Sequence, residues 1–538
     1  MKSMCETRIL AAFLSGIMVS IPHICTAFST EQESPKPNIV LVVVDDMGYG
    51  DVSIYNPDSR IPTPNIDKLA SQGLMFTNGH TCASQCSPTR YGILTGRYSW
   101  RTRLSTGVLP HFDEPLIDPG RITIASLLKE QGYSTACIGK WHLGLGWQPV
   151  AGKMIDHRSW GSQTKIIDYG KPLTISPNDY GFDYYFGLNA SNNMLPYCFI
   201  ENHKVVEIPD KLKHPVYDTE DGAGLVSPDY KTEHVEKKLF GKAMAWLGNH
   251  VKEKPGKPFF LYYPMSAIHR PCLPDDPNIG RSRAGLRGDK VTEVDDLMGR
   301  LLKWLDDNHL ADNTLFILTS DNGARPGDPT AALVKLARND YGERYYPQKL
   351  IDYEKELAAL PSYEKPDGSQ PYQIYNHASC GPFKGYKTDI YEGGHRVPFI
   401  VRWPGVVKKG EVKDDLVCTL DFMSTFAAIV GKDLPANAGE DSYNMLPLFK
   451  GNNKGPIRTA LVHKAWKKDK IAITSGDWKL VPFKDGGGLY KFKDVAPDGQ
   501  LFNLKDDPQE KVNLYLKYPD KVTDLALLLE RIIGGSKE

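Results

Sequence analysis

Apolar residues along the chain fall into short continuous runs, and segments with helical spacing lie between them. The clearest runs cover residues 38–44 and 314–319, where apolar and β-branched residues follow one another almost without interruption. Such runs are typical of strands that are buried on both faces of a sheet. We predict further strands at 134–138, 258–263 and 397–402.

Three segments between these strands carry the signals of helices. Residues 63–73 begin with Thr63, whose side chain is expected to accept backbone N–H bonds, and end with Gly73, which suits a left-handed exit. A second helix is predicted from Thr123, and apolar residues recur at helical spacing over 293–305. Helices that alternate with apolar strands predict a three-layer α/β domain with a large, mostly parallel sheet.

Two later segments differ from this pattern. Residues 324–373 are rich in Pro, Tyr and charge and have little periodicity, so we predict a long insertion that borders the functional site. After about residue 451, short strand-like pieces at 472, 478–480 and 489–490 are separated by the glycine triplet 486–488 and followed by a helical pattern over 519–532. These features predict a small α+β subdomain with a short antiparallel sheet.

The N-terminus has the composition of a secretory signal. Lys2 and Arg8 precede an apolar stretch over 9–21, and small residues then lead to Ala27. We predict a signal peptide over 1–27, a catalytic domain over 28–450 and a C-terminal subdomain over 451–538. The protein is then exported, to the periplasm or outside the cell. An uncleaved anchor and a lipid-modified Cys25 are the alternatives.

Composition limits the class of partner. The 538 residues include 65 basic and 65 acidic side chains, and this balance argues against a protein that binds nucleic acid through its charge. No apolar run after the signal is long enough to span a bilayer, so no membrane span is expected in the mature chain.

Acidic residues stand where two of the apolar strands end. Asp45 and Asp46 follow the strand at 38–44, and Asp321 and Asn322 follow the strand at 314–319. The carboxyl ends of strands are the usual position of sites in open α/β sheets. An all-oxygen set without His or thiolate favours Ca2+, and Mg2+ less, over zinc. Each pair by itself is equally consistent with ordinary turn chemistry.

A short segment around Cys86 gives the most specific signal. It reads Cys86-Ser87-Pro88-Thr89-Arg90 and is soon followed by Leu94-Thr95-Gly96-Arg97, and it resembles the signature of the type I sulfatases. In that family the cysteine is oxidised after synthesis to formylglycine (3-oxoalanine), an aldehyde whose hydrate attacks sulfate esters. The plain alternative is a loop cysteine beside a proline turn.

Other segments match the family in the same order between positions 45 and 398. They include Lys140 and His142 after the strand at 134–138, His269 after the strand at 258–263, and Lys387 in the segment that leads to Val397. Lys384 is the less favoured candidate for the second lysine. The resemblance implies an alkaline-phosphatase-like fold with a mixed sheet.

The resemblance also implies roles for these residues. The divalent ion is held by Asp45, Asp46, Asp321, Asn322 and the residue derived from Cys86. The sulfate group is contacted by two lysines, Lys140 and Lys387. Proton transfer is assigned to His142 at the hydrate, to His269 at the ester oxygen and to Asp321 at the attacking hydroxyl, and Arg90 orients the hydrate.

The implied activity is that of a sulfuric ester hydrolase that acts on a sulfated sugar of a polysaccharide or glycan. Galactose or N-acetylgalactosamine 6-sulfate is the expected substrate, and ulvan, carrageenan and glycosaminoglycan fragments stay open. A maturation enzyme that generates formylglycine is the implied partner. Conversion of Cys86 would leave six of the seven cysteines of the mature chain, which permits zero to three disulfides.

Three other functions compete with this interpretation. A phosphatase or phosphodiesterase of the same superfamily would carry Ser or Thr as nucleophile near two zinc ions. An inactive secreted carbohydrate-binding homologue would be expected to have lost some of the ligands or lysines. An enzyme that uses Cys86 as a thiolate leaves two lysines, two histidines and a metal set without a role.

Overall fold

The computed structural model describes residues 35–213, 224–325, 377–489 and 498–535. The predicted signal peptide and nearly all of the predicted insertion at 324–373 lie outside these residues. The predicted domain boundary at 450 stays a prediction.

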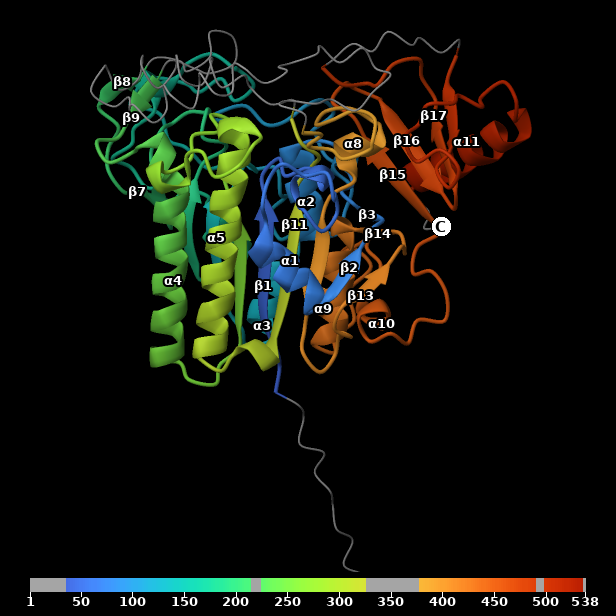
Figure 1. Ribbon diagram of the computed structural model, residues 1–538. Helices are drawn as coiled ribbons and strands as arrows, with labels where there is room; N and C mark the ends of the chain where they lie inside the picture. Colours follow the sequence, from blue (N-terminus) through green and yellow to red (C-terminus); the bar gives the residue numbers. More distant parts are fainter. Residues whose placement is uncertain (1–34, 214–223, 326–376, 490–497, 536–538) are drawn as a thin grey trace, which may run out of the picture. The chain divides into compact units, whose positions relative to one another are not determined.

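A ten-stranded mixed sheet forms the centre of the described chain (Figure 1). Its strands pair in the order β13 (Glu411–Lys413), β2 (Leu74–Phe76), β12 (Phe399–Arg402), β11 (Thr314–Ser320), β1 (Asn38–Val44), β10 (Phe259–Pro264), β4 (Ser134–Lys140), β5 (Tyr184–Leu188), β6 (Ile200–Glu201) and β7 (Lys204–Val205).

The strands from β11 to β5 in this order run parallel to one another. In this register Val44 at the end of β1 lies opposite Ser320 at the end of β11, and Val43 lies opposite Pro264 at the end of β10. The loops that follow these strands therefore leave the sheet side by side. Every residue of β1 is buried, as its apolar run predicts.

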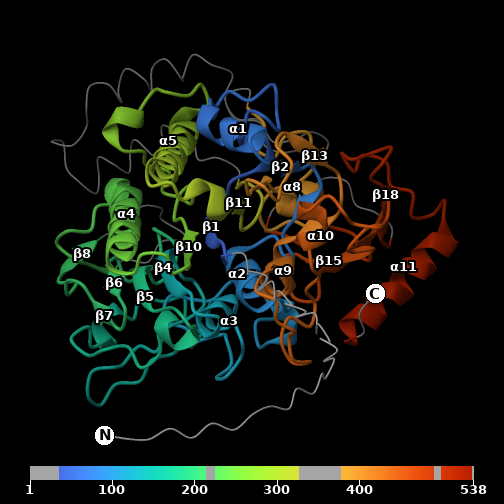
Figure 2. The ribbon, with the colours of Figure 1, turned by 90° about the horizontal axis from the view of Figure 1, so that it is seen from below.

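Helices cover both faces of the sheet, so the predicted three layers are confirmed (Figure 2). One face carries α1 (Pro64–Ser71), α4 (Val235–Glu253) and α5 (Gly285–Asp307). The other face carries α2 (Cys86–Thr95), α3 (Ile124–Glu130) and α9 (Phe422–Ile429). The short helix α8 (Glu392–His395) precedes β12 in the chain, and the short helix α10 (Leu446–Phe449) follows α9.

The details of α1 differ from the prediction. Thr63 Oγ1 accepts a hydrogen bond from the Ser53 backbone N–H at 2.9 Å, not from an N–H of the helix. Gly73 does not adopt a left-handed conformation, because its φ is not positive. Instead, a Cβ atom at Gly73 would overlap the carbonyl oxygen of Val401, so glycine permits close approach of the neighbouring strand.

The C-terminal part forms its own four-stranded antiparallel sheet, as predicted. The strands are β15 (Ala460–Lys464), β16 (Ile471–Ser475), β17 (Trp478–Val481) and β18 (Gln500–Asn503), and α11 (Pro519–Ile533) packs against them. The strand predicted at 489–490 is wrong for Leu489, which lies in a loop. Two-stranded sheets join β3 (Gly79–His80) to β14 (Val417–Cys418) and β8 (Lys211–Lys213) to β9 (Gly224–Val226).

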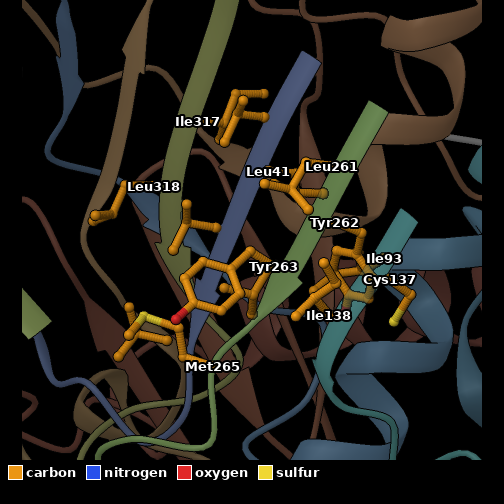
Figure 3. Packing of buried hydrophobic residues seen from close by; sticks show 14 of the residues in the cluster. Leu41, Ile93, Cys137, Ile138, Leu261, Tyr262, Tyr263, Met265, Ile317 and Leu318 are labelled. Carbon is orange, nitrogen blue, oxygen red and sulfur yellow. The ribbon is translucent and has the colours of Figure 1, made fainter. Parts of the chain in front are cut away.

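The central core lies between the large sheet and its helices (Figure 3). Leu41, Leu261 and Ile317 from three neighbouring strands are fully buried there, and Ile93 of α2 packs into the same core. The cysteines at 82, 86, 137, 198, 272, 380 and 418 are all buried and free, so none of these seven forms a disulfide. The helices of the described ranges are each too short or too polar to span a bilayer.

Candidate active site

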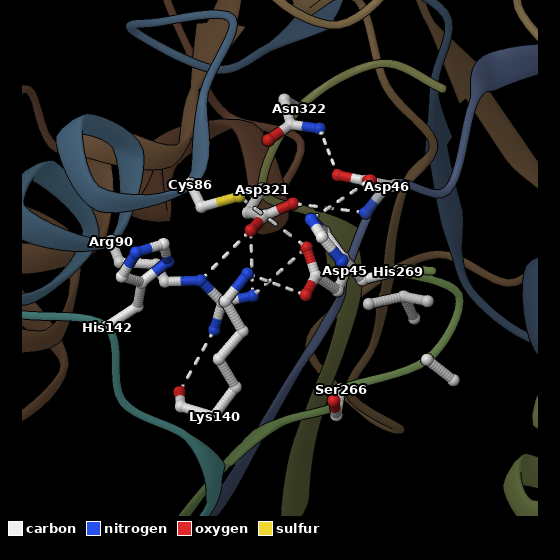
Figure 4. A network of polar contacts seen from close by, with 12 residues as sticks. Asp45, Asp46, Cys86, Arg90, Lys140, His142, Ser266, His269, Asp321 and Asn322 are labelled. Atoms are coloured by element: carbon white, nitrogen blue, oxygen red, sulfur yellow. Dashed lines mark hydrogen bonds and ion pairs between the residues drawn. The ribbon is translucent and has the colours of Figure 1, made fainter. Parts of the chain in front are cut away.

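The polar residues predicted from the strand ends meet at one edge of the sheet (Figure 4). Asp45 and Asp46 follow β1, and Asp321 and Asn322 follow β11, its neighbour. Lys140 is the last residue of β4. His142 and His269 lie on the loops after β4 and β10, so four adjacent parallel strands supply the site.

Cys86 completes this group from a helix on one face of the sheet. It is the first residue of α2, and its side chain is buried. Its sulfur lies 3.7 Å from Asp45 Oδ1 and 3.2 Å from Lys387 Nζ. Burial raises the pKa of the Cys86 thiol to about 12, although Lys140 and Lys387 act against this shift. An unmodified thiol in this position is therefore protonated and a poor nucleophile.

Two buried lysines each pair with one residue of the acidic doublet, which is Asp45 and Asp46. Lys140 Nζ donates to Asp45 Oδ2 at 2.7 Å, and Lys387 Nζ donates to Asp46 Oδ1 at 2.5 Å. Burial would lower the pKa of Lys387, but Asp46 and the other anionic groups of the site together outweigh it and raise the pKa. Lys384 lies elsewhere, with its ammonium 4.4 Å from the ring centre of Tyr391. The structure therefore brings Lys387, and not Lys384, into the site.

Arg90 ties α2 to the ends of two strands. Its Nε donates to Asp321 Oδ2 at 2.9 Å, and its Nη1 donates to the Lys140 carbonyl at 3.1 Å. Burial opposes the charge of Arg90, but Asp321 and Asp45 outweigh this effect and raise its pKa. Arg90 therefore remains a fixed positive charge beside Cys86.

Both histidines of the site are held neutral. Burial, and then the charge of Lys140, lowers the pKa of His142, and burial and then Lys387 lower the pKa of His269. His142 Nε2 donates to the Leu109 carbonyl at 3.1 Å, which leaves Nδ1 as the basic nitrogen. His142 Nδ1 is buried without a hydrogen-bond partner among the described residues.

The donors around the doublet suit a hard divalent cation. Ligand atoms of Asp45, Asp46, Cys86 and His269 lie within 4.8 Å of one another. Within the described part of the chain, Asp46 Oδ2 and Asn322 Oδ1 are buried without a hydrogen-bond partner. Carboxylate and amide oxygens of this kind fit Ca2+ or Mg2+.

Asp321, a predicted ligand, makes two hydrogen bonds of its own, and the ligand set stays a prediction. Asp321 Oδ2 accepts from Arg90, and Asp321 Oδ1 accepts from the Asp46 backbone N–H at 3.2 Å. Burial and the nearby Asp45 raise the pKa of Asp321. His269, which was not predicted as a ligand, lies with its Nε2 3.8 Å from Asp46 Oδ2.

Sequence reasoning missed Arg287, which supports the acidic doublet from α5. Its Nη2 donates to the Asp46 carbonyl at 3.0 Å, and its guanidinium pairs with both carboxylate oxygens of Asp51 at 2.7 Å. The predicted helix starts at 293, whereas α5 begins at Gly285. Arg287 therefore lay outside the predicted helix. A predicted helix that began near residue 285 would have placed the charged Arg287 in a buried first turn, and this would have marked it as a candidate.

Glu236 of α4 was missed as well. Its Oε1 accepts from the backbone N–H groups of Ser266 and Ala267 at 2.6 and 2.8 Å. The Ala267 carbonyl in turn accepts from the Asp45 N–H at 2.7 Å. Glu236 therefore supports both Asp45 and the loop that carries His269. No local pattern distinguishes it from an ordinary glutamate in a first helical turn.

Comparison with known proteins gives two family matches. The sulfatase family profile matches residues 37–432, and the profile of the C-terminal part of N-sulphoglucosamine sulphohydrolase matches residues 385–533. The first match covers well over half of the chain.

Individual relatives agree with these matches. An N-acetylgalactosamine-6-O-sulfatase of Bacteroides thetaiotaomicron is 31% identical over 93% of this chain and 94% of its own length. Human N-acetylgalactosamine-6-sulfatase is 29% identical over 76% of this chain and 65% of its own. A protein structure solved in a study of the metabolism of multiple glycosaminoglycans by B. thetaiotaomicron is 30% identical to this chain. It has a TM-score of 0.73 and aligns over 93% of this chain and 99% of that chain.

Proposed function

The chain belongs to the sulfatase family and hydrolyses sulfate esters, and we propose that it removes an O-sulfate group from a sulfated sugar of a polysaccharide or glycan. One observation carries this proposal. Lys140, Lys387 and Arg90 surround Cys86 and the acidic doublet in a buried site, and together they provide fixed positive charge for an anionic ester.

We propose that Cys86 acts as formylglycine, produced by a separate maturation enzyme. The Cys-Ser-Pro-Thr-Arg segment supports this assignment, and so does the raised pKa of the unmodified thiol. Formylglycine would supply a hydrated aldehyde as the nucleophile. Serine or a protonated thiol does not supply that chemistry.

A divalent cation, Ca2+ in preference to Mg2+, fits the acidic doublet. Asp45, Asp46, Asp321, Asn322 and residue 86 would hold it. The ion would supply Lewis-acid stabilisation of charge on the sulfate oxygens.

The side chains of this chain divide the remaining work. Lys140 and Lys387 bind the sulfate oxygens, and Arg90 fixes α2 against the strand ends. His142 accepts a proton at Nδ1, because its Nε2 is committed to the Leu109 carbonyl. His269 is assigned to the oxygen of the leaving sugar, and the anionic ester beside it would raise its pKa so that it carries the proton this oxygen needs as the ester bond breaks.

For the substrate we propose galactose or N-acetylgalactosamine 6-sulfate. Relatives that bear the name N-acetylgalactosamine-6-sulfatase support this choice, and one of them aligns over nearly the full length of both chains. We also propose that the protein is exported to the periplasm or outside the cell, which the apolar N-terminal stretch supports.

Mass spectrometry of the peptide that contains position 86 tests the nucleophile. The protein is produced with and without a formylglycine-generating enzyme, and an aldehyde or its hydrate is expected only with that enzyme, together with activity. A free thiol in fully active protein would contradict the proposal. Release of sulfate and phosphate from matched aryl esters then separates a sulfatase from a phosphatase.

A panel of defined sulfated oligosaccharides tests the substrate. The panel pairs 6-sulfated with 4-sulfated N-acetylgalactosamine and galactose. Selective release from the 6-sulfated members is expected, and preference for another position or sugar would overturn the substrate assignment while leaving the sulfatase activity intact.

A further inference from the structure

Thr388, the residue after Lys387, has an unusual backbone conformation. Its φ is 83°, in the left-handed region that β-branched residues rarely occupy. A conformation of this kind persists only where the surrounding structure imposes it, and such residues cluster at functional sites. Thr388 directly follows Lys387, whose ammonium lies 3.2 Å from the Cys86 sulfur.

Three hydrogen bonds hold Thr388 in place. Its N–H donates to the Ser84 carbonyl at 2.8 Å, two residues before Cys86. Its carbonyl accepts from the Trp466 N–H at 3.0 Å, and its hydroxyl accepts from the Leu489 N–H at 3.1 Å. Trp466 and Leu489 both belong to the C-terminal part of the chain. That part therefore fixes the backbone beside a sulfate-binding lysine.

The glycine triplet at 486–488 makes this contact close. The Ile390 N–H donates to the Gly486 carbonyl at 2.9 Å. At Gly488 a Cβ atom would overlap Asp389 Oδ1 and would lie 2.9 Å from Thr388 Oγ1. Gly488 itself is buried. Glycine is the residue that lets this loop press against residues 388 and 389.

The C-terminal sheet also holds the segment that leads to Cys86. The Ser84 N–H donates to the Lys464 carbonyl at 3.0 Å, and the Lys464 N–H donates to the Cys82 carbonyl at 3.2 Å. Lys464 is the last residue of β15. The same sheet therefore contacts both the Cys86 segment and the Lys387 segment.

A buried ion cluster reinforces the Lys387 side. Lys479 of β17 pairs with Glu392 at 2.9 Å and with Glu510 at 2.8 Å, and all three side chains are fully buried. The Glu392 N–H also donates to Glu510 Oε2 at 2.7 Å. Glu392 begins α8, five residues after Lys387, so the cluster anchors the end of the same segment.

We propose that the C-terminal sheet sets the position of Lys387 relative to residue 86, with Thr388 and Gly488 as the positioning residues. This inference rests on the proposed function, in which Lys387 contacts the sulfate group. The C-terminal part then acts on the site through its contacts with Ser84, Thr388 and Glu392.

Gly488→Ala is the first test, with Gly455→Ala as its control. Gly455 lies before the same sheet, and a Cβ atom there would meet nothing within 4 Å. Wild-type protein is first shown to release sulfate, and conversion of Cys86 is measured in every variant by mass spectrometry. If the wild type releases none, the proposed function itself has failed, and no variant is needed to show it.

Relative to converted wild type, Gly488→Ala is expected to lower kcat/KM by about 10- to 100-fold, since small displacements of catalytic groups cost this much. Inhibition by inorganic sulfate, the probe for the lysine site, is expected to weaken as well. Gly455→Ala is expected to match wild type in both. An unchanged kcat/KM in folded, converted Gly488→Ala would overturn the proposal.

Thr388→Val and Thr388→Ser provide a second test that needs no added bulk. Valine removes the hydroxyl that accepts from Leu489, whereas serine keeps it. Activity and sulfate inhibition are expected to fall in Thr388→Val and to recover in Thr388→Ser. Equal losses in both variants would contradict a positioning role for the hydroxyl.

A double-mutant cycle with Lys387→Ala shows whether the effect acts through the lysine. If Gly488 acts through Lys387, Gly488→Ala lowers kcat/KM little further once Lys387 is alanine. Fully additive losses would show that Gly488 acts independently of Lys387 and would overturn the proposal.

Discussion

The ammonium nitrogen of Lys387 lies 3.2 Å from the sulfur of Cys86, although 301 positions separate the two residues in the chain. The same ammonium pairs with Asp46 at 2.5 Å. Lys387 therefore connects the nucleophile position to the acidic doublet, and a sulfate group bound at residue 86 would meet this charge directly.

Lys387→Ala is expected to lower kcat/KM by about 100- to 1,000-fold, because it removes a buried positive charge that faces the sulfate oxygens. Lys384→Ala is the matched control. Lys384 lies three residues earlier, packs on aromatic rings and donates to the Glu510 carbonyl at 3.5 Å. Steady-state rates on a sulfate ester check both variants, and comparable losses in the two would refute the assignment of Lys387.

Cys86→Ala is expected to abolish turnover while the protein stays folded, because the substitution removes the proposed nucleophile. Cys198→Ala is the control, since Cys198 is also buried and free but lies outside the site. The control is expected to lose stability and keep its activity. Sulfate release and thermal melting are measured together, and residual turnover in Cys86→Ala would contradict the mechanism.

Removal of divalent cations with a chelator is expected to lower both activity and melting temperature, and Ca2+ is expected to restore them. The reason is that the proposed ion supplies part of the counter-charge of the acidic doublet, beside Lys140 and Lys387. Asn322→Ala should shift the midpoint of the Ca2+ response upward by about 10-fold or more, by loss of a buried oxygen donor. Asn452→Ala, at an exposed position, should leave the midpoint unchanged. A melting temperature insensitive to chelation would argue against a bound cation.

Glu236→Gln is expected to flatten the pH dependence of stability. Burial raises the pKa of Glu236 from 4.5 to about 7, so the folded protein binds this proton more tightly than the unfolded chain does. The resulting stability is complete below pH 4.5 and is lost as the pH rises to about 7. This contribution is at most about 3 kcal/mol. Glutamine does not ionise and still offers an oxygen to Ser266 and Ala267.

Urea unfolding from pH 4.5 to 8 checks this prediction, with exposed Glu253→Gln as the control from the same helix. Above pH 7 the Glu236→Gln protein is expected to be at least as stable as wild type. If its unfolding free energy follows the wild-type curve through this range, Glu236 is not the group responsible.

Acid is expected to loosen the contact that β3 and α8 make with the C-terminal sheet. Burial lowers the pKa of His80 from 6.5 to about 3, and His395 and His463 stack with ring centres 3.7 Å apart. Because the pKa is lower in the folded protein, its stability is complete above pH 6.5 and is lost as the pH falls toward 3.

His463→Phe keeps a ring in the stack but removes one titrating group, whose pKa burial also lowers. Its unfolding free energy is expected to fall less steeply below pH 6.5 than that of wild type. Exposed His309→Asn serves as the control and should retain the wild-type slope. Chemical unfolding at several pH values measures this, and an unchanged slope in His463→Phe would count against the stack.

Local sequence patterns determined the strands, the three layers and most of the site. An apolar run is a direct record of burial on both faces, and the polar residue after it must lie at the carboxyl end of the strand. For this reason Asp45, Asp46, Asp321 and Asn322 were found without a structure. The resemblance of the Cys86 segment to a family signature then supplied Arg90, both lysines and both histidines.

Only the tertiary structure decided which groups support these residues. Arg287, Glu236 and Thr388 act through backbone contacts between segments far apart in the chain, and such contacts leave no periodic trace in the sequence. Gly73 and Gly488 likewise owe their identity to the atoms that approach them from other strands and loops. Periodicity records which side of an element is buried, whereas the partner that buries it is fixed only when the chain has folded.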